Sequence, residues 1–191
     1  MRLLVAALDS ELVAFPAALD GFDRLVTGPG KLKATYALTR ALDAHAYDEV
    51  LVVGTAGAIG DDDSKVFEVL EVTAAIQHDV SDIDGIAGQH VSLPQRVDVG
   101  EGSDAHGATI ATGDHFVDDA DAVAEIRGLG ASLVDMETYA YIWVAQQFGV
   151  PIRVLKAVSD RAQDDAITDW HAALAACSAQ LRERVRELYG V

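Results

Sequence analysis

Two acidic clusters in this chain stand where apolar, strand-like runs end. Asp135-Met136-Glu137 follows the run Ala131–Val134, and Lys156-Ala157-Val158-Ser159-Asp160 follows the run Ile152–Leu155. Strand ends in α/β domains converge on one edge of the sheet, where ligands bind. Because unpaired buried acids are costly, carboxylates delivered to that edge are explained better by chemistry than by packing.

A further carboxylate, Glu11, follows the short apolar run Leu3–Leu8. Each acid also has a purely structural explanation, because Glu11 and Asp160 can cap a helix and Glu137 can lie in a first helical turn. Acids at the ends of several separate strands are harder to explain by capping alone. Paired carboxylates in different environments can act as general acid and general base, which suits hydrolysis of a glycosidic bond.

Other site types are less well supported by the sequence. Gly28-Pro29-Gly30-Lys31 lacks P-loop spacing, since Leu32 follows the lysine, and it lacks the third glycine of a dinucleotide fingerprint. The segment is either a simple tight turn or a turn that lets backbone approach a ligand. We expect no metal, because His78, His106 and His115 form no metal-ligand spacing.

Nucleophilic catalysis by serine or cysteine is not supported either. Ser159 has no Gly-x-Ser-x-Gly elbow. Cys177, the single cysteine, lies in an alanine-rich helical pattern and is expected to be a small buried hydrophobic residue. With no disulfide available and no signal peptide or membrane-spanning run, we expect a cytoplasmic protein.

Composition indicates one domain over residues 1–191, half of whose residues are hydrophobic. The chain has 14 Lys and Arg against 31 Asp and Glu, a formal charge of −17. Such a surface repels phosphate backbones and anionic lipid, so we expect neither nucleic acid nor membrane as a partner. The acidity is read mainly as an adaptation for solubility or high salt.

Apolar periodicity predicts strands and helices in alternation, with a glycine turn at Gly54-Thr55-Ala56-Gly57 and mostly loops over Gln77–Glu101. This alternation is typical of an α/β domain with a largely parallel or mixed sheet. The expected strands are Leu3–Leu8, Arg24–Thr27, Glu49–Val53, Val66–Ile76, Ala108–Thr112, Leu133–Val134 and Ile152–Ala157. The expected helices are Lys31–His45, Asp118–Arg127, Glu137–Phe148 and Ile167–Tyr189.

Six short motifs, in order along the chain, resemble the nucleoside phosphorylase and nucleosidase superfamily, most closely its methylthioadenosine/S-adenosylhomocysteine nucleosidase branch. The resemblance implies a three-layer αβα sandwich with a central mixed sheet, no cofactor, and a homodimer formed through the region around His78–Gly88. The motifs are Ala6–Leu12, Thr27–Lys31, Gly54–Gly57, Thr112–Val117, Val134–Glu137 and Val158–Asp160.

The resemblance implies catalytic roles for three residues. Asp160 would protonate the purine at N7, and Ser159 would help to orient the Asp160 carboxyl group. Glu11 would position and deprotonate the attacking water. The physical chemistry agrees, because flanking carboxylates stabilise a sugar that becomes cationic in the transition state.

A second set of residues is implied to bind the purine nucleoside. Glu137 would hold the ribose hydroxyls and Met136 would lie against the sugar. Phe116 would stack on the purine, and the Val117 backbone would bond to the edge of the base. The sugar would rest on a floor formed by Thr55, Ala56 and Gly57.

Several positions depart from the family pattern and leave the 5′ group of the substrate open. Asp135 replaces a glutamate, and Lys156 replaces an arginine with loss of its bidentate geometry. Leu8 and Pro29 stand beside the sugar, and Trp170 stands where an aromatic residue usually meets the 5′ substituent. We count Asp135, Lys156 and Trp170 among the substrate-binding residues.

Hydrolysis is favoured over phosphorolysis on the same comparison. Related phosphorylases hold phosphate with an arginine in the strand before the Gly54 turn and another in the first loop. Here the strand is the apolar Leu51-Val52-Val53 and the loop is Asp9-Ser10-Glu11. The predicted substrate is methylthioadenosine or S-adenosylhomocysteine. The alternatives are futalosine or another purine nucleoside, a phosphorylase, and a non-catalytic purine-binding module.

Overall fold

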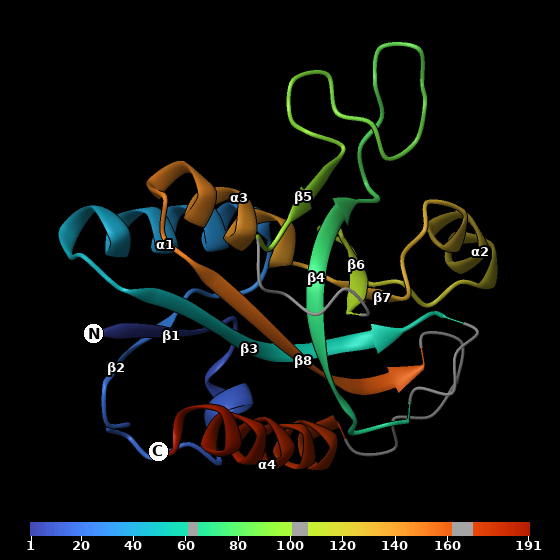
Figure 1. Ribbon diagram of the computed structural model, residues 1–191. Helices are drawn as coiled ribbons and strands as arrows, with labels where there is room; N and C mark the ends of the chain where they lie inside the picture. The colour runs from blue at the N-terminus through green and yellow to red at the C-terminus, as the bar shows by residue number, and fades with distance from the viewer. Residues whose placement is uncertain (61–64, 101–106, 162–169) are drawn as a thin grey trace.

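The computed structural model of the protein describes residues 1–60, 65–100, 107–161 and 170–191, except for the side chain of Trp170 (Figure 1). The described strands form one mixed sheet with helices on both faces, which confirms the predicted three-layer α/β class. The strands are β1 (Arg2–Ala6), β2 (Phe22–Val26), β3 (Glu49–Ala58), β4 (Val69–Gln77), β5 (Arg96–Asp98), β6 (Ala108–Thr112), β7 (Leu133–Asp135) and β8 (Ile152–Arg161).

The pairing of the strands makes part of the sheet close on itself. Strand β3 is parallel to β1 and β8 and is antiparallel to β7 at its far end. From β7 the ladder continues through β6 to β4, and β4 pairs back with β8. The carboxyl ends of β1, β7 and β8 and the second half of β3 are thereby brought to one region of the sheet.

Four helices and a short 3₁₀ helix surround this sheet in the described part of the chain. Helices α1 (Lys31–Ala44) and α3 (Thr138–Phe148) lie side by side on one face, and α4 (Trp170–Tyr189) covers the other (Figure 1). Helix α2 (Ala120–Gly128) packs at one end, with the Asp119 side chain accepting a hydrogen bond from the backbone N–H of Asp121. The 3₁₀ helix η1 (Asp9–Leu12) follows β1 and packs on α4.

Alternating apolar residues in the central strands divide the core between the two faces of the sheet. In β3, Val50 and Val52 pack with α1 and α3, whereas Leu51 and Val53 pack with η1 and α4. This period of two is what a strand buried on both faces requires. Cys177 of α4 is fully buried in the second cluster, as predicted.

Two predicted strand ends were wrong in a way that matters for the site. Strand β3 does not stop at Gly54 but runs on to Ala58, so the predicted glycine turn is part of the strand. Strand β8 likewise runs on through Ser159 and Asp160. The two strands remain paired throughout, and a register shift between Ala56 and Gly57 places Gly57 opposite Asp160. Tertiary pairing therefore overrides the local preference of glycine for turns.

The remaining differences are small. Strand β4 begins at Val69 rather than at Val66, and the region Gln77–Glu101, which was predicted to be mostly loop, contains the short strand β5. The described part of α4 begins at Trp170, and the predicted start at Ile167 lies outside the described residues. Of the described helices, none has the length and apolar character needed to cross a membrane.

Candidate active site

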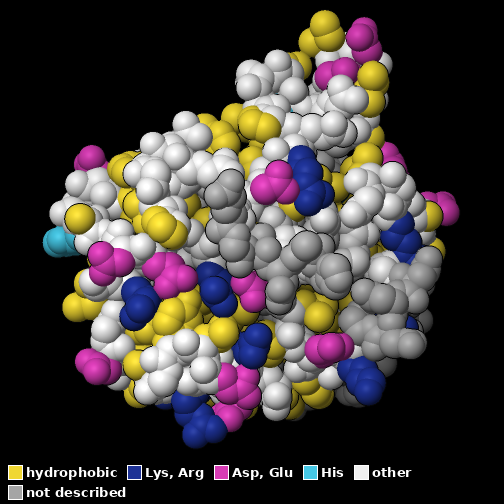
Figure 2. Space-filling model, viewed as in Figure 1, with side chains coloured by type: hydrophobic (Ala, Val, Ile, Leu, Met, Phe, Trp, Pro, Cys, Tyr) yellow, Lys and Arg dark blue, Asp and Glu magenta, His cyan; other side chains and the backbone are white. Residues whose placement is uncertain are grey.

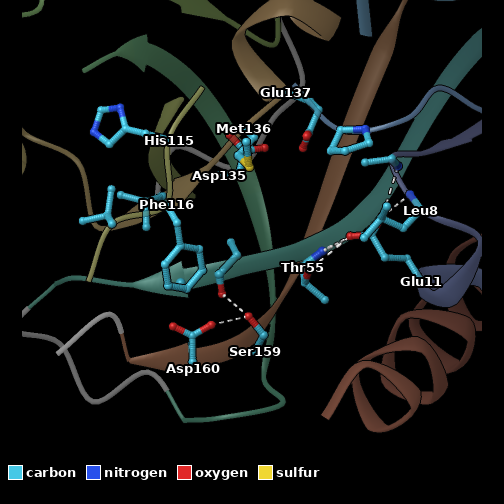
Figure 3. Close-up of a pocket in the computed structure, with 16 residues that line it drawn as sticks. Leu8, Glu11, Thr55, His115, Phe116, Asp135, Met136, Glu137, Ser159 and Asp160 are labelled. Atoms are coloured by element: carbon cyan, nitrogen blue, oxygen red, sulfur yellow. Dashed lines mark hydrogen bonds between the residues drawn. The ribbon is translucent and has the colours of Figure 1, made fainter. Parts of the chain in front are cut away.

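One pocket collects nearly all of the predicted site residues (Figure 3). The space inside it, including the open mouth, is about 710 Å³. The end of β1, the second half of β3, the ends of β7 and β8, and the loop after β6 all contribute. The predicted residues that line it are Glu11, Thr55, Ala56, Gly57, Phe116, Val117, Asp135, Met136, Glu137, Ser159 and Asp160.

The pocket also has lining residues outside the predicted set. Leu8 and Pro29, which the resemblance places beside the sugar, line the pocket together with Ala7 and Val134. His115 was missed as a site residue, although its position between Asp114 and Phe116 in a recognised motif was a signal for it. Trp170 cannot be placed in the pocket, because its side chain lies outside the described residues.

Glu11 is held rigidly at the junction of β1 and β3. Its Oε2 accepts hydrogen bonds from the backbone N–H groups of Ala7 (3.0 Å) and Leu8 (2.9 Å). Its Oε1 accepts from the backbone N–H (2.8 Å) and the hydroxyl (3.1 Å) of Thr55. Only an ionised carboxylate accepts four such bonds without itself donating one, so the surroundings suit a carboxylate anion.

Lys156 and Asp135 form a buried ion pair beneath the pocket. The Lys156 Nζ lies 2.9 Å from Asp135 Oδ2, and each side chain is only 2% exposed. Asp135 also accepts hydrogen bonds from the hydroxyls of Thr112 (2.7 Å) and Thr138. Burial opposes ionisation of Asp135, but Lys156 and the threonine hydroxyls outweigh it and hold its pKa below the ordinary value.

The placement of Lys156 corrects the expectation that it contacts substrate. Lys156 does not line the pocket, because its ammonium group is turned towards Asp135 and packed against β3. A Cβ atom on Gly54 would lie 3.0 Å from both Lys156 Nζ and Glu11 Oε1. Gly54 therefore lets the ammonium and the Glu11 carboxylate approach the strand from the two neighbouring elements, and Lys156 acts on the site through its charge.

Glu137 lines the same pocket as Glu11 and has a perturbed pKa. Its Oε1 accepts a hydrogen bond from the backbone N–H of Gly30 (2.7 Å). Burial, followed by repulsion from Asp135, raises the pKa of Glu137 to about 7, despite the opposing effect of Lys156 and of the Gly30 N–H. Near neutral pH this carboxyl group is therefore present in both its protonated and its ionised form.

Asp160 and Ser159 face the pocket from the last residues of β8 (Figure 3). The Ser159 hydroxyl donates to Asp160 Oδ2 at 2.6 Å and lies 3.3 Å from the carbonyl oxygen of Ala56. The carbonyl and the carboxylate fix the hydroxyl, and the hydroxyl in turn fixes the carboxyl group. Asp160 is thus a half-exposed acid aimed at the cavity, opposite the aromatic ring of Phe116.

The loop after β6 supplies the aromatic wall. Phe116 is 64% exposed and turns its ring into the cavity, and Val117 beside it is buried. The His115 ring packs edge-on against His78, with ring centroids 4.9 Å apart. An exposed aromatic side chain on a pocket wall is a ready surface for stacking a flat base.

Charge in the pocket is strongly one-sided. Four carboxyl groups line it, from Glu11, Asp135, Glu137 and Asp160, whereas no lysine or arginine does so in the described part of the chain. The described residues also include no cluster of three or more potential metal ligands. Such a site stabilises a developing cation, and its described lining supplies no lysine or arginine to hold an anion.

Comparison with known proteins places the chain among enzymes that act on nucleosides. The model of the phosphorylase superfamily matches residues 25–189. The 5'-methylthioadenosine/S-adenosylhomocysteine nucleosidase of Anoxybacillus flavithermus is 30% identical over 166 residues, which cover 76% of this chain and 71% of the relative. The aminodeoxyfutalosine nucleosidase of Helicobacter pylori is 31% identical over 165 residues, covering 76% and 69%.

A solved structure extends the similarity to three dimensions. The 5'-methylthioadenosine/S-adenosylhomocysteine nucleosidase of Neisseria meningitidis, in complex with methylthio-immucillin-A, superposes with a TM-score of 0.82 at 25% identity. The superposition covers 98% of this chain and 97% of the other.

The raised pKa of Glu137 leads to a prediction about stability. In the folded protein Glu137 keeps its proton up to about pH 7, whereas its ordinary pKa is 4.5. Its stabilising contribution is therefore full below about pH 4.5 and is lost as pH rises through about 7. Glu137→Gln cannot titrate, so the free energy of unfolding of the native protein, relative to that variant, should fall between pH 5 and pH 8.

Urea unfolding of both proteins at several pH values measures this difference. Glu125→Gln on the exposed side of α2 is the matched control, and its curve should run parallel to that of the native protein. Parallel curves for Glu137→Gln as well would show that Glu137 has no raised pKa.

Proposed function

This chain belongs to the phosphorylase superfamily, and on that premise we propose that its pocket hydrolyses the N-glycosidic bond of a purine nucleoside. The products are the free base and the free ribose derivative. The observation that carries this proposal is the convergence of Glu11, Glu137 and Asp160 around one cavity that has no lysine or arginine among its described lining residues. A cationic sugar would be stabilised there, and an attacking phosphate would be repelled.

Departure of the base begins with Asp160. We assign it as the general acid that donates its proton to N7 of the purine as the bond between C1′ and N9 breaks. The bonding electrons then pass into the protonated purine, which leaves as a neutral base instead of an anion. The Ser159 hydroxyl, 2.6 Å from Asp160 Oδ2, holds the carboxyl group in the orientation needed for this transfer.

Glu11 is assigned the opposite task on the sugar. As a water oxygen attacks C1′, Glu11 takes one of the water protons, so that the cationic sugar becomes neutral. The four hydrogen bonds that fix Glu11 place this base before substrate arrives, which lowers the reorganisation needed in the transition state. The positive charge of Lys156 offsets the mutual repulsion of the neighbouring carboxylates.

The sugar itself is assigned to Glu137, Met136 and the strand β3. Glu137 faces the cavity and binds ribose hydroxyls, with Met136 against the ring, above Thr55, Ala56 and Gly57. The base then extends towards Phe116 and the Val117 backbone. Asp135 is assigned a supporting role, since its carboxylate is already occupied by Lys156 and two threonine hydroxyls.

The 5′ substituent is the open part of the substrate. The relatives named above act on methylthioadenosine, S-adenosylhomocysteine or aminodeoxyfutalosine, and these define the candidate set for this chain. We favour the first two and propose that Trp170 meets the 5′ group. A screen of purine nucleosides, read by chromatography of the released base, ranks the candidates.

Net charge and cysteine content support a proposal about the cellular location and the partners of the protein. We propose a cytoplasmic protein that binds neither nucleic acid nor membrane. The net charge of −17 disfavours anionic partners, and the single cysteine is free and buried.

Hydrolysis predicts that turnover does not depend on phosphate. With phosphate-free buffer, free base and free reducing sugar should appear at the same rate as with 50-fold more phosphate than nucleoside. Appearance of a sugar 1-phosphate only when phosphate is added would replace the proposal with a phosphorylase.

Asp160→Asn tests the general acid. Asparagine keeps the size and the hydrogen bond from Ser159 but cannot protonate N7, so kcat should fall by roughly 10²–10⁴-fold. Binding of a non-hydrolysable purine analogue, measured by calorimetry, should change little. Unchanged turnover would remove Asp160 from the mechanism, and an inactive native protein that still binds the analogue would indicate a purine-binding module.

We also propose that the protein is a homodimer formed through the segment around His78–Gly88. Ile83 is 89% exposed there, Ile86 is also exposed, and hydrophobic side chains are visible on the outside of this projection at the top of Figure 2. Light scattering should give twice the chain mass of 20.2 kDa, and Ile83→Asp should shift the protein towards monomer. A native monomer at tens of micromolar would overturn the assignment.

A further inference from the structure

The segment Gly28-Pro29-Gly30-Lys31 lies against the pocket at the start of α1, and Lys31 has no role in the chemistry proposed above. Gly30 precedes the helix with φ +94°, a conformation that favours glycine, and a Cβ there would lie 3.0 Å from Asp114 Oδ1. Two consecutive backbone N–H groups point away from the helix start. That of Gly30 donates to Glu137 Oε1 at 2.7 Å, and that of Lys31 donates to Asp114 Oδ1 at 2.8 Å.

The side chain of Lys31 closes a ring of contacts with the same neighbours. Lys31 Nζ donates to Asp79 Oδ1 at 2.6 Å and to Gln77 Oε1 at 2.9 Å. The other Asp79 oxygen accepts from the backbone N–H of Asp114 at 2.8 Å. Lys31, Asp79 and Asp114 are therefore joined in a closed circuit that links the start of α1, the end of β4 and the loop after β6. We refer to these three residues as the clamp.

The clamp is connected both to the loop residues His115–Val117 and to Glu137. Asp114 immediately precedes His115, Phe116 and Val117, which form the wall assigned to the base. The Gly30 N–H, one residue before Lys31, fixes the carboxyl group assigned to the ribose. The backbone N–H groups of Gly30 and Lys31 are adjacent at the start of α1. They therefore set the distance between Glu137, assigned to the ribose, and the loop after Asp114, assigned to the base.

The contacts are stronger than those of an ordinary surface ion pair. The Lys31 and Asp79 side chains are 18% and 14% exposed, and both have further hydrogen-bond partners. Burial opposes ionisation of Asp79, but Lys31 and the Asp114 N–H hold its pKa below the ordinary value. Pairs with this burial and geometry are less screened than exposed ones.

We propose that Lys31, Asp79 and Asp114 are positioning residues for the glycosidic reaction, which fix the base wall and Glu137 at the spacing that a nucleoside requires. The proposal rests on the function proposed above for this pocket. None of the three lines the pocket, so their effect passes through Glu137 and the loop residues His115–Val117.

Kinetics of Lys31→Met, Asp79→Asn and the double variant test the proposal. Each single change opens the circuit, so kcat/KM for the best nucleoside substrate should fall roughly tenfold to hundredfold, as displacement of binding groups by about 1 Å does. The double variant should be no worse than the worse single one, since both break the same circuit. Asp114→Asn, which keeps the acceptor for the Lys31 N–H, should retain far more activity than Asp114→Ala.

Glu71→Gln is the matched control. It removes a carboxylate that faces Arg153 at 3.7 Å, a similarly half-buried pair outside the pocket, and should leave kcat/KM unchanged. Equal losses in this variant and in Lys31→Met, or losses that follow thermal stability alone, would assign the clamp a purely structural role and overturn the proposal.

A second readout does not depend on catalysis. The Gly30 N–H lowers the proton affinity of Glu137, while the groups facing Glu137 from the other elements are Asp135, Lys156 and Glu11, none of which is altered. Loss of the clamp should therefore move the Glu137 titration, followed by carboxyl ¹³C NMR, to higher pH in Lys31→Met and leave it in place in Glu71→Gln. An unmoved titration would overturn the proposal even in an active enzyme.

The NMR result also separates the two proposals. If the native protein hydrolysed no nucleoside but the titration still moved, the proposed function would fail while the mechanical link between clamp and Glu137 would stand. If hydrolysis were confirmed and neither kcat/KM nor the titration responded, only the clamp would fail.

Discussion

A single buried ammonium group makes this site possible. Lys156 lies 2.9 Å from Asp135, and its positive charge is felt by Glu137 and Glu11 as well. Burial alone would lower the pKa of this lysine, but the three carboxyl groups raise it above the ordinary value. Removing one partner of a buried ion pair leaves an uncompensated charge and costs about 3–5 kcal/mol. The acids can therefore be concentrated at one end of the sheet only because the lysine lies beneath them, and Gly54 leaves the space that it needs.

The same arrangement gives neighbouring carboxyl groups different properties. Asp135 has the lysine and two threonine hydroxyls, so its pKa is lowered, and it serves as a fixed anion. Glu137 is buried beside that anion with a weaker set of donors, so its pKa rises to about 7. Glu11 receives four hydrogen bonds, and Asp160 receives one from Ser159. In the proposed reaction, Asp135 is the fixed charge, Glu137 the ribose ligand, Glu11 the base and Asp160 the proton donor.

The backbone that carries these groups is unusually continuous. Strands β3 and β8 pass through the site as paired strands, and their register shift puts Gly57 opposite Asp160. Strand residues form part of the site, and segments next to the strand ends supply Leu8, Glu11, Pro29, Met136-Glu137 and His115–Val117. Asp160 lies in β8, Glu11 lies in η1 shortly after β1, and Glu137 lies between β7 and α3, so these acids are held in strands or next to strand ends.

The sequence by itself determined the fold class and most strand and helix positions, because these depend on apolar periodicity. Six short motifs in order along the chain indicated the residues that meet in the pocket. Ala108–Thr112 and the helix starting at Lys31 were predicted to within a residue. Prediction from local sequence was wrong at Gly54–Gly57 and at Ser159-Asp160, because the glycine and polar residues there indicated that the strands end. Only the tertiary structure decided that both strands continue, that Lys156 is turned beneath the pocket towards Asp135, and that Lys31 reaches Asp79 and Gln77. Each of these depends on partners distant in the chain, whose hydrogen bonds and charges outweigh the preference of the local segment.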